Sequence, residues 1–171
     1  MKIGPTSSGR RLYIMRHAKS SWKLPDLPDF ARPLNGRGRR DAPRMGRLIA
    51  EEHGLPELVL CSAARRSVET YCAVAGAWTG WPELRVDPAF YGCGPDVWLD
   101  ALVAVPETVG TVMLVGHMPA MWELLVDLVG AKHAPDRFPT AALAVVESNA
   151  PWPEITSAAC RLLSFQMPRD L

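Results

Sequence analysis

The sequence predicts an α/β protein in which helices cover both faces of a mostly parallel central sheet, giving a three-layer α/β/α sandwich. Strand-like and helix-like segments alternate along the 171 residues, as units of strand, helix and strand require. The segment Thr111 to Val115 is apolar and β-branched without alternation, which is typical of a strand buried on both faces. In addition, histidine or arginine residues follow the ends of three expected strands, where the ligand crevice of such a sheet forms.

The first expected strand, Leu12 to Met15, is short and apolar, and basic residues follow it at once at Arg16 and His17. We expect residues 1–11 to be a flexible lead-in. The length of the chain then predicts a single domain, over residues 12–171.

A helix is expected between Asn35 and His53, but its start is ambiguous. Apolar residues recur there at helical spacing, while Pro43 lies inside the pattern. Either Asn35 caps a helix that is kinked at Pro43, or Asp41 caps a shorter helix that begins there. The sequence alone does not choose between the two.

Glu57 to Cys61 predict the second strand, and Ser62 stands where the N-cap of the next helix is expected. Apolar residues at helical spacing indicate that helix. They are Val68, Tyr71, Cys72, Ala75 and Trp78.

The second half of the chain continues the alternation. After the strand at Thr111 to Val115, a helix is expected with Pro119 at its first position and Gly130 at its end. The other expected elements are a weak strand at Leu84 to Val86, a helix at Pro95 to Val105, and late strands at Ala142 to Glu147 and Arg161 to Gln166.

Composition predicts a soluble, cytoplasmic protein. Hydrophobic residues make up 48% of the chain and charged residues 22%, with a formal net charge of +1, so any electrostatic attraction must be local. No signal peptide or membrane span is indicated. The four cysteines show no metal-type spacing, and we expect them to be reduced, partly buried thiols.

Two adjacent arginines, Arg65 and Arg66, stand near the start of the second expected helix. Cations at a helix N-terminus oppose the helix dipole unless an anion binds there. Together with Arg16 and His17, and with His117 after the buried strand, they favour a site for a phosphate-like anion.

Four segments resemble the histidine phosphatase superfamily, also called the phosphoglycerate mutase-like superfamily. The first is the stretch "RHAKSSW", and the second is Gly116-His117 after a buried strand. The other two are spaced motifs, with Ser62, Arg66 and Thr70 in one and Leu34, Gly38 and Ala42 in the other. The opening and the short length look closest to the compact SixA-type branch of phosphohistidine phosphatases.

The resemblance implies a mechanism. His17 would be the catalytic nucleophile and form a phosphohistidine intermediate, while Arg16 and Arg66 would grip the phosphoryl oxygens. His117 would donate a further hydrogen bond to the phosphoryl group, and no metal or cofactor would be needed. Arg65 lies about 100° from Arg66 around a helix and is therefore interpreted as a surface residue.

Two further residues are expected to bind substrate, Ser20 and, with less support from the family pattern, Lys23. Lys19 and Lys23 both depart from the mutase-type pattern, and Lys23 either binds phosphate or lies exposed. Ester hydrolysis also needs an acid for the leaving group. Four carboxylates are candidates by location alone: Asp26, Asp29, Glu83 and Asp87.

The implied partner is a phosphorylated protein, with a phosphohistidine carrier protein as one candidate, or a small phosphorylated molecule. The main alternative is a non-catalytic module of the same fold that binds phosphate or a phosphoprotein. Trp22 and Phe90-Tyr91 are candidates for the pocket mouth.

A basic run, Arg37, Arg39, Arg40, Arg44 and Arg47, raises the question of nucleic acid. No aromatic residues are interleaved for base stacking, so a solvated helix face is the better interpretation. We accordingly expect no nucleic-acid or membrane partner. The histidines lack the spacing of a metal site.

Overall fold

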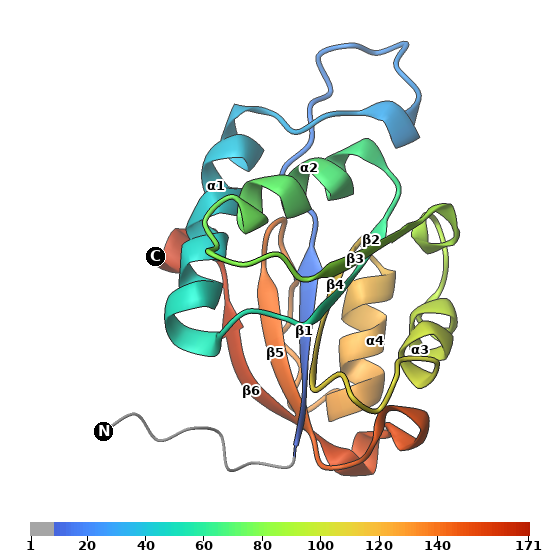
Figure 1. Cartoon of the computed structure of the whole chain (residues 1–171). Helices are drawn as coiled ribbons and strands as arrows, with labels where there is room; N and C mark the ends of the chain where they lie inside the picture. Colours follow the sequence, from blue (N-terminus) through green and yellow to red (C-terminus); the bar gives the residue numbers. More distant parts are fainter. Residues whose placement is uncertain (1–8) are drawn as a thin grey trace.

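The central element is a six-stranded sheet with the strand order β3-β2-β4-β1-β5-β6. A computed structural model describes residues 9–171, and its elements are labelled in Figure 1. The strands are β1 (Arg10–Arg16), β2 (Leu58–Ser62), β3 (Glu83–Asp87), β4 (Thr111–Gly116), β5 (Leu143–Ser148) and β6 (Cys160–Gln166).

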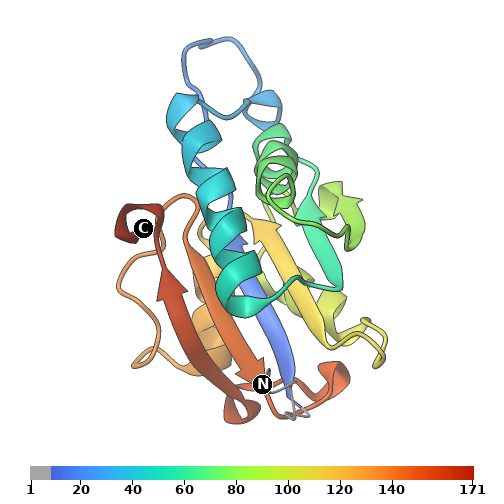
Figure 2. The same ribbon diagram turned by 60° about the vertical axis from the view of Figure 1, so that its left-hand side comes forward.

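The sheet is mostly parallel, as expected. β1 pairs parallel with β4, and β2 pairs parallel with both β4 and β3. β5 is antiparallel to both of its neighbours, so it alone among the six strands runs in the opposite direction. Figure 2 shows β5 pointing against β1 and β6. The carboxyl ends of β1, β2 and β4 therefore lie at one edge of the sheet.

Helices cover both faces of the sheet (Figure 1). Helices α1 (Gly36–Leu48) and α2 (Arg65–Ala75) pack on one face of the sheet, and helices α3 (Pro95–Val103) and α4 (Ala120–Val129) pack on the other. Successive strand residues point to opposite faces. Tyr13 and Met15 of β1 therefore belong to the core under α1 and α2, and Leu12 and Ile14 belong to the core under α3 and α4. The three-layer sandwich is confirmed.

The first alternative for α1 is correct. Asn35 is its N-cap, and the side chain of Asn35 accepts a hydrogen bond of 2.9 Å from the backbone N–H of Gly38. Pro43 lies inside the helix, where Asp41 is buried rather than capping. A turn of π-helix over Ile49–His53 (η2) extends the helix.

The expectation for the start of α2 was wrong. Ser62 is the last residue of β2, and Ala64 is the N-cap, without a side-chain hydrogen bond. The buried face also differs from the predicted apolar stripe, because Cys72 is exposed while Ser67 and Thr70 are buried. Polar residues face inward on this helix because they meet other polar groups beneath it.

Several element ends moved by one to three residues. β1 begins at Arg10, inside the expected lead-in, of which residues 1–8 lie outside the described part of the chain. α3 ends at Val103 rather than Val105, and Pro119 is the N-cap of α4 instead of its first residue. Short helical turns fill the connections, namely η1 (Asp29–Ala31), η3 (Pro88–Phe90), η4 (Trp152–Glu154), η5 (Ser157–Ala159) and η6 (Pro168–Asp170).

All four cysteines are free thiols, of which Cys61 is buried and Cys72 exposed. Within residues 9–171, no helix has the length and apolar character needed to cross a membrane.

Candidate active site

The ends of three parallel strands bring the predicted residues together. His17 follows β1 and His117 follows β4, and the N–H of His17 donates to the carbonyl of Gly116 at 2.9 Å. Arg66 lies in the first turn of α2, the helix that follows β2, and its side chain reaches the two histidines. The rings of His17 and His117 lie 5.0 Å apart, and Nε of Arg66 is 3.2 Å from Nε2 of His17.

These residues line a crevice of about 280 Å³. Its wall consists of Arg16, His17, Lys19, Ser20, Trp22, Asp29, Arg66, His117, Met118 and Thr140. Lys23, expected to bind substrate, is exposed and does not belong to this wall. Lys19 lines the crevice instead.

The hydrogen bonds of His17 fix its tautomer. Nδ1 lies 2.8 Å from the carbonyl oxygen of Ala18, and a carbonyl oxygen can only accept, so Nδ1 carries the proton. The N–H of Arg66 donates to Nε2. Nε2 is therefore the unprotonated nitrogen, the form that a nucleophilic imidazole requires, and its lone pair accepts from Arg66 in the free protein.

The surroundings also keep His17 uncharged. Burial lowers the pKa of His17 to about 3; the hydrogen bond to Ala18 opposes that shift, while the charges of His117, Arg66 and Arg16 add to it. The side chain is 7% exposed. At neutral pH the imidazole is thus unprotonated at Nε2.

His117 is held by two serines. Its Nε2 lies 2.7 Å from Oγ of Ser62 and 3.3 Å from Oγ of Ser67. Burial lowers the pKa of His117 to about 4, with Arg66 and Arg16 adding to the shift and Asp29 opposing it. Sequence reasoning missed Ser67, because a serine inside a helix carries no signal of its own.

Two nitrogen atoms of the crevice residues are buried without a hydrogen-bond partner in the described part of the chain: Nε of Arg16 and Nδ1 of His117. Leaving such a group unsatisfied costs about 1–3 kcal/mol. Nη1 of Arg16 is tied to the carbonyl of Phe138 at 2.9 Å. Burial and the charge of Arg66 lower the pKa of Arg16. Arg16 and His117 both belong to the crevice wall.

Asp29 joins the site from the loop after β1. Its Oδ2 accepts hydrogen bonds from Nη2 of Arg66 at 2.9 Å and from the hydroxyl of Tyr91 at 2.8 Å. Of the four acid candidates, Asp29 is the one in the crevice wall. Glu83 instead pairs with Arg85, and Asp87 caps the turn η3.

Of the three aromatic residues expected at the pocket mouth, Trp22 belongs to the crevice wall, and Tyr91 contacts the wall residues Asp29 and His117. Trp22 lines the crevice, with the guanidinium carbon of Arg32 4.1 Å from its ring centre. Tyr91 stands edge-on to His117 at 5.6 Å. Phe90 is buried instead and stacks on Trp98.

Thr70 supports the chain behind the nucleophile. Its Oγ1 accepts from the backbone N–H of Ala18 at 2.9 Å and donates to the carbonyl of Arg66 at 2.6 Å. The motif residues Ser62, Arg66 and Thr70 therefore contact three separate parts of one site. Arg65 points away, is 57% exposed and pairs with Glu69, as the helical angle predicted.

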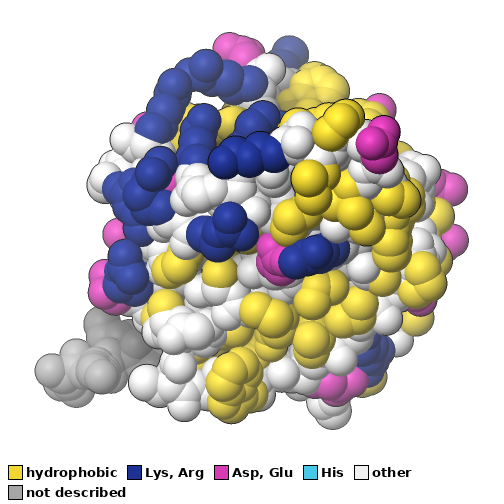
Figure 3. All heavy atoms as spheres, turned by 90° about the horizontal axis from the view of Figure 1, so that it is seen from above, with side chains coloured by type: hydrophobic (Ala, Val, Ile, Leu, Met, Phe, Trp, Pro, Cys, Tyr) yellow, Lys and Arg dark blue, Asp and Glu magenta, His cyan; other side chains and the backbone are white. Residues whose placement is uncertain are grey.

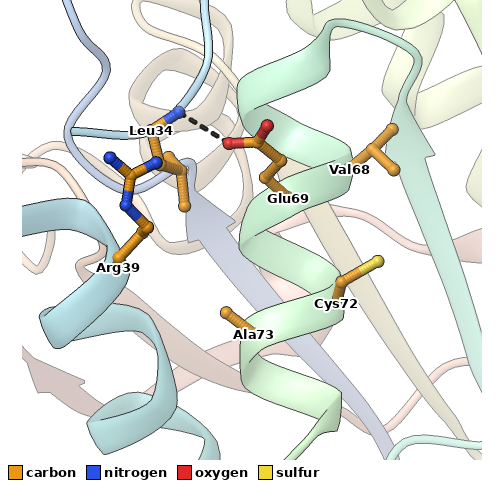
Figure 4. A pocket seen from close by; sticks show the side chains of 6 residues that line it. All are labelled: Leu34, Arg39, Val68, Glu69, Cys72 and Ala73. Atoms are coloured by element: carbon orange, nitrogen blue, oxygen red, sulfur yellow. Dashed lines mark hydrogen bonds between the residues drawn. The ribbon is translucent and has the colours of Figure 1, made fainter. Parts of the chain in front are cut away.

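A larger hollow of about 570 Å³ lies elsewhere, between α1 and α2. Figure 4 shows its lining, where the carboxylate of Glu69 accepts from the backbone N–H of Leu34. Arg39 is its cation, and the remaining lining is Val68, Cys72 and Ala73. It contains none of the predicted site residues, so size alone does not identify the site.

Basic side chains gather on one side of the end that carries the crevice, as Figure 3 shows from above. Two arginines of the basic run, Arg37 and Arg40, both lie within 4.0 Å of the carboxylate of Asp41. In residues 9–171, no group of three or more His, Cys, Asp or Glu side chains is placed to hold a metal ion.

Comparison with known proteins identifies one family and related proteins of similar length. A family model described as "Histidine phosphatase superfamily (branch 1)" matches residues 12–98. An uncharacterized protein of Mycobacterium tuberculosis is 31% identical over 165 residues, which cover 91% of this chain and 100% of that protein.

Two solved structures described provisionally as phosphohistidine phosphatase SixA are similar over nearly the whole chain. The one from Agrobacterium tumefaciens is 34% identical with a TM-score of 0.82, covering 93% of this chain and 98% of its own. The one from Nakamurella multipartitia is 28% identical with a TM-score of 0.83, covering 94% and 96%.

Proposed function

The chain belongs to the histidine phosphatase superfamily and to its SixA-type branch, and from this premise we propose that it is a phosphatase in which His17 accepts the phosphoryl group before water releases it. The single observation that carries the proposal is the state of His17. Its Nε2 is unprotonated and accepts a hydrogen bond from the Arg66 guanidinium, while Nδ1–H is tied to Ala18.

The proposed reaction depends on positioning and fixed positive charge. Arg16 and Arg66 bind phosphoryl oxygens, because a planar guanidinium can serve two oxygens at once. With the hydroxyl of Ser62 or Ser67 donating to Nε2 of His117, the His117 proton would lie on Nδ1 and would be available to the phosphoryl group. These contacts stabilise the charge as it redistributes in the transition state. No step in this proposal is assigned to a metal ion or a cofactor.

We propose a phosphorylated protein as the substrate, with phosphohistidine on a carrier protein favoured over a small phosphorylated molecule. The two solved structures described as phosphohistidine phosphatases support this choice. Lys19 and Trp22 are exposed at the crevice wall and are available to a protein surface. Ser20 is 8% exposed within that wall and is assigned to substrate binding. Four free thiols fit a reducing cytoplasm.

Dephosphorylation of a phosphohistidine protein and of a small aryl phosphate tests the proposal. The wild-type protein should release phosphate from at least one of them and should carry acid-labile radioactive phosphate during turnover. His17→Ala should form no phosphoenzyme. Arg66→Lys should lower kcat/KM by about 10²-fold or more.

Arg65→Lys is the matched control for Arg66→Lys, because it changes the neighbouring arginine, which points to solvent. Its kcat/KM should stay within about 2-fold of wild type. If neither substrate is hydrolysed while inorganic phosphate still binds, the protein is a binding module and the proposal of a phosphatase is wrong.

A further inference from the structure

The carboxylate of Asp29 is the acid that the fold brings to the crevice. The loop after β1 carries it there on the turn η1, more than ten residues from His17 in sequence. One guanidinium, that of Arg66, bridges the two side chains: Nε contacts Nε2 of His17 at 3.2 Å, and Nη2 contacts Oδ2 of Asp29 at 2.9 Å. Arg66 therefore places the nucleophilic nitrogen and the Asp29 carboxylate on one guanidinium.

The exposed fractions of the side chains indicate that Asp29 lies on the side of the leaving group and not on the side of the nucleophile. His17 and His117 are 7% and 8% exposed, at the bottom of the crevice, whereas the Asp29 side chain is 44% exposed. In phosphoryl transfer the nucleophile and the leaving group lie on opposite sides of phosphorus. With His17 attacking from below, the leaving group projects toward solvent, on the side where Asp29 lies.

We propose that Asp29 donates the proton that the leaving group needs and afterwards takes one from the attacking water. The inference rests on the proposed function and adds a residue to it. In the first step, Nε2 of His17 forms the bond to phosphorus, and the bond from phosphorus to the leaving atom breaks. The electron pair stays on the leaving atom, which takes the Asp29 proton.

In the second step, the oxygen of water bonds to phosphorus as its proton passes to the Asp29 carboxylate. The bond from phosphorus to Nε2 breaks, and its electron pair returns to the imidazole. Asp29 is again protonated, His17 is neutral, and inorganic phosphate has formed. The sum is substrate plus water giving alcohol or amine plus phosphate, with no other reactant.

Asp29 must change partners when substrate binds. Burial raises the pKa of Asp29, but hydrogen bonds from Tyr91 and Arg66 and the charges of Arg66 and Arg32 outweigh it, so the free enzyme holds a carboxylate. Phosphoryl oxygens compete for the same Nη2 of Arg66. A dianion that takes this cation leaves the carboxyl group beside negative charge, which favours its protonated form. The carboxylate takes this proton from solvent when substrate binds and returns it when phosphate leaves.

Tyr91 keeps the carboxyl group in place during that exchange. Its hydroxyl contacts Oδ2 of Asp29 at 2.8 Å, and its ring stands edge-on to His117. Arg32 lies 3.8 Å from Oδ1. The groups that face Asp29 are thus Arg66, Arg32 and Tyr91, with His117 nearby and kept neutral by burial.

The test compares two small aryl phosphates that differ in the leaving group. p-Nitrophenyl phosphate releases a stable anion that needs little protonation, and phenyl phosphate does not. Asp29→Asn should lose less than about 10-fold in kcat/KM on the first and about 10²–10⁴-fold on the second. Asp29→Glu, which keeps a carboxyl group, should recover part of the loss on phenyl phosphate. Thermal unfolding of each variant confirms that it is folded.

Asp26→Asn is the matched control, because Asp26 is exposed on the same loop and outside the crevice wall. It should hydrolyse both esters as the wild type does. Equal losses of Asp29→Asn on both esters would show that Asp29 merely positions Arg66 and would overturn the inference while leaving the phosphatase intact. If wild type and Asp26→Asn hydrolyse neither ester nor phosphohistidine protein, the proposed function itself fails, and this inference with it.

Discussion

His17 is kept neutral by its surroundings and not by a neighbouring base. Its pKa of about 3 results first from burial and then from nearby positive groups. The hydrogen bond to the Ala18 carbonyl works in the opposite direction, yet it is what fixes the proton on Nδ1. A residue with this arrangement is ready as a nucleophile at any pH at which the protein is folded and well above pH 3.

The same arrangement makes stability depend on pH. In the unfolded chain His17 takes up a proton below its ordinary pKa of 6.5, whereas in the folded protein it does so only near 3. Unfolding therefore binds protons in this window, and the free energy of unfolding falls as pH decreases. Between about pH 7 and about pH 5 the expected loss is about 2 kcal/mol for His17.

Urea unfolding of wild type and His17→Asn at the two pH values measures this effect. The fall in unfolding free energy should be smaller in His17→Asn by about 2 kcal/mol, whatever the variant's stability at neutral pH. His117→Asn should behave alike, because burial lowers the pKa of His117 to about 4. An equal fall in wild type and both variants would contradict the burial account.

At the scale of elements, α1 is pressed against the loop that carries the site. A Cβ placed on Gly38 would lie 2.3 Å from the carbonyl oxygen of Lys19. That carbonyl cannot easily move, because it accepts the backbone N–H of Asn35 at 2.9 Å. The glycine of the motif formed by Leu34, Gly38 and Ala42 thus allows the start of α1 to approach the chain just after His17.

Gly38→Ala should accordingly destabilise the protein by about 1–3 kcal/mol, the usual cost of forced overpacking. Gly36→Ala is the matched control in the same helical turn, since nothing lies within 4 Å of its added Cβ, and it should cause no loss. Urea unfolding gives both values. A Gly38→Ala protein as stable as wild type would show that the loop yields without cost.

The α2 helix shows why its apolar stripe was misread. Ser67 and Thr70 occupy its inner face, where they contact His117 and the backbone of Ala18. Cys72, which was counted as apolar in the predicted stripe, is exposed to solvent. Periodicity assumes that the inner face is apolar, and that assumption fails where a helix borders a polar site instead of a core.

At the scale of the whole molecule, the sheet is protected unevenly. All residues of β2, all but the first of β4 and the four central residues of β1 are buried, and β4 has a strand on each side. Every residue of β3 is exposed, and β3 pairs with β2 alone. Local opening costs least where few apolar contacts are lost, so the β3 edge is where we expect the fold to open first.

Native-state hydrogen exchange tests this order. Amides of β4 should exchange only by global unfolding, while hydrogen-bonded amides of β3 should open with a free energy lower by about 2 kcal/mol or more. Low denaturant concentrations that leave the protein folded separate the two classes. Exchange of β3 amides through the same global opening as β4 would contradict the expectation.

The sequence by itself determined which strands exist, their ends to within a few residues, and that Arg16, His17, Arg66 and His117 lie at or just after those ends. Strand patterns and parallel topology are enough for this, because the carboxyl ends of neighbouring parallel strands share an edge. Contacts between residues far apart in the sequence could not be predicted from it. The tertiary structure decided that Asp29, rather than Asp26, Glu83 or Asp87, reaches the crevice, and that Lys19 lines it where Lys23 was expected. The Asp29–Tyr91 contact spans 62 residues, and such a pairing depends on how whole elements pack, which no local pattern encodes.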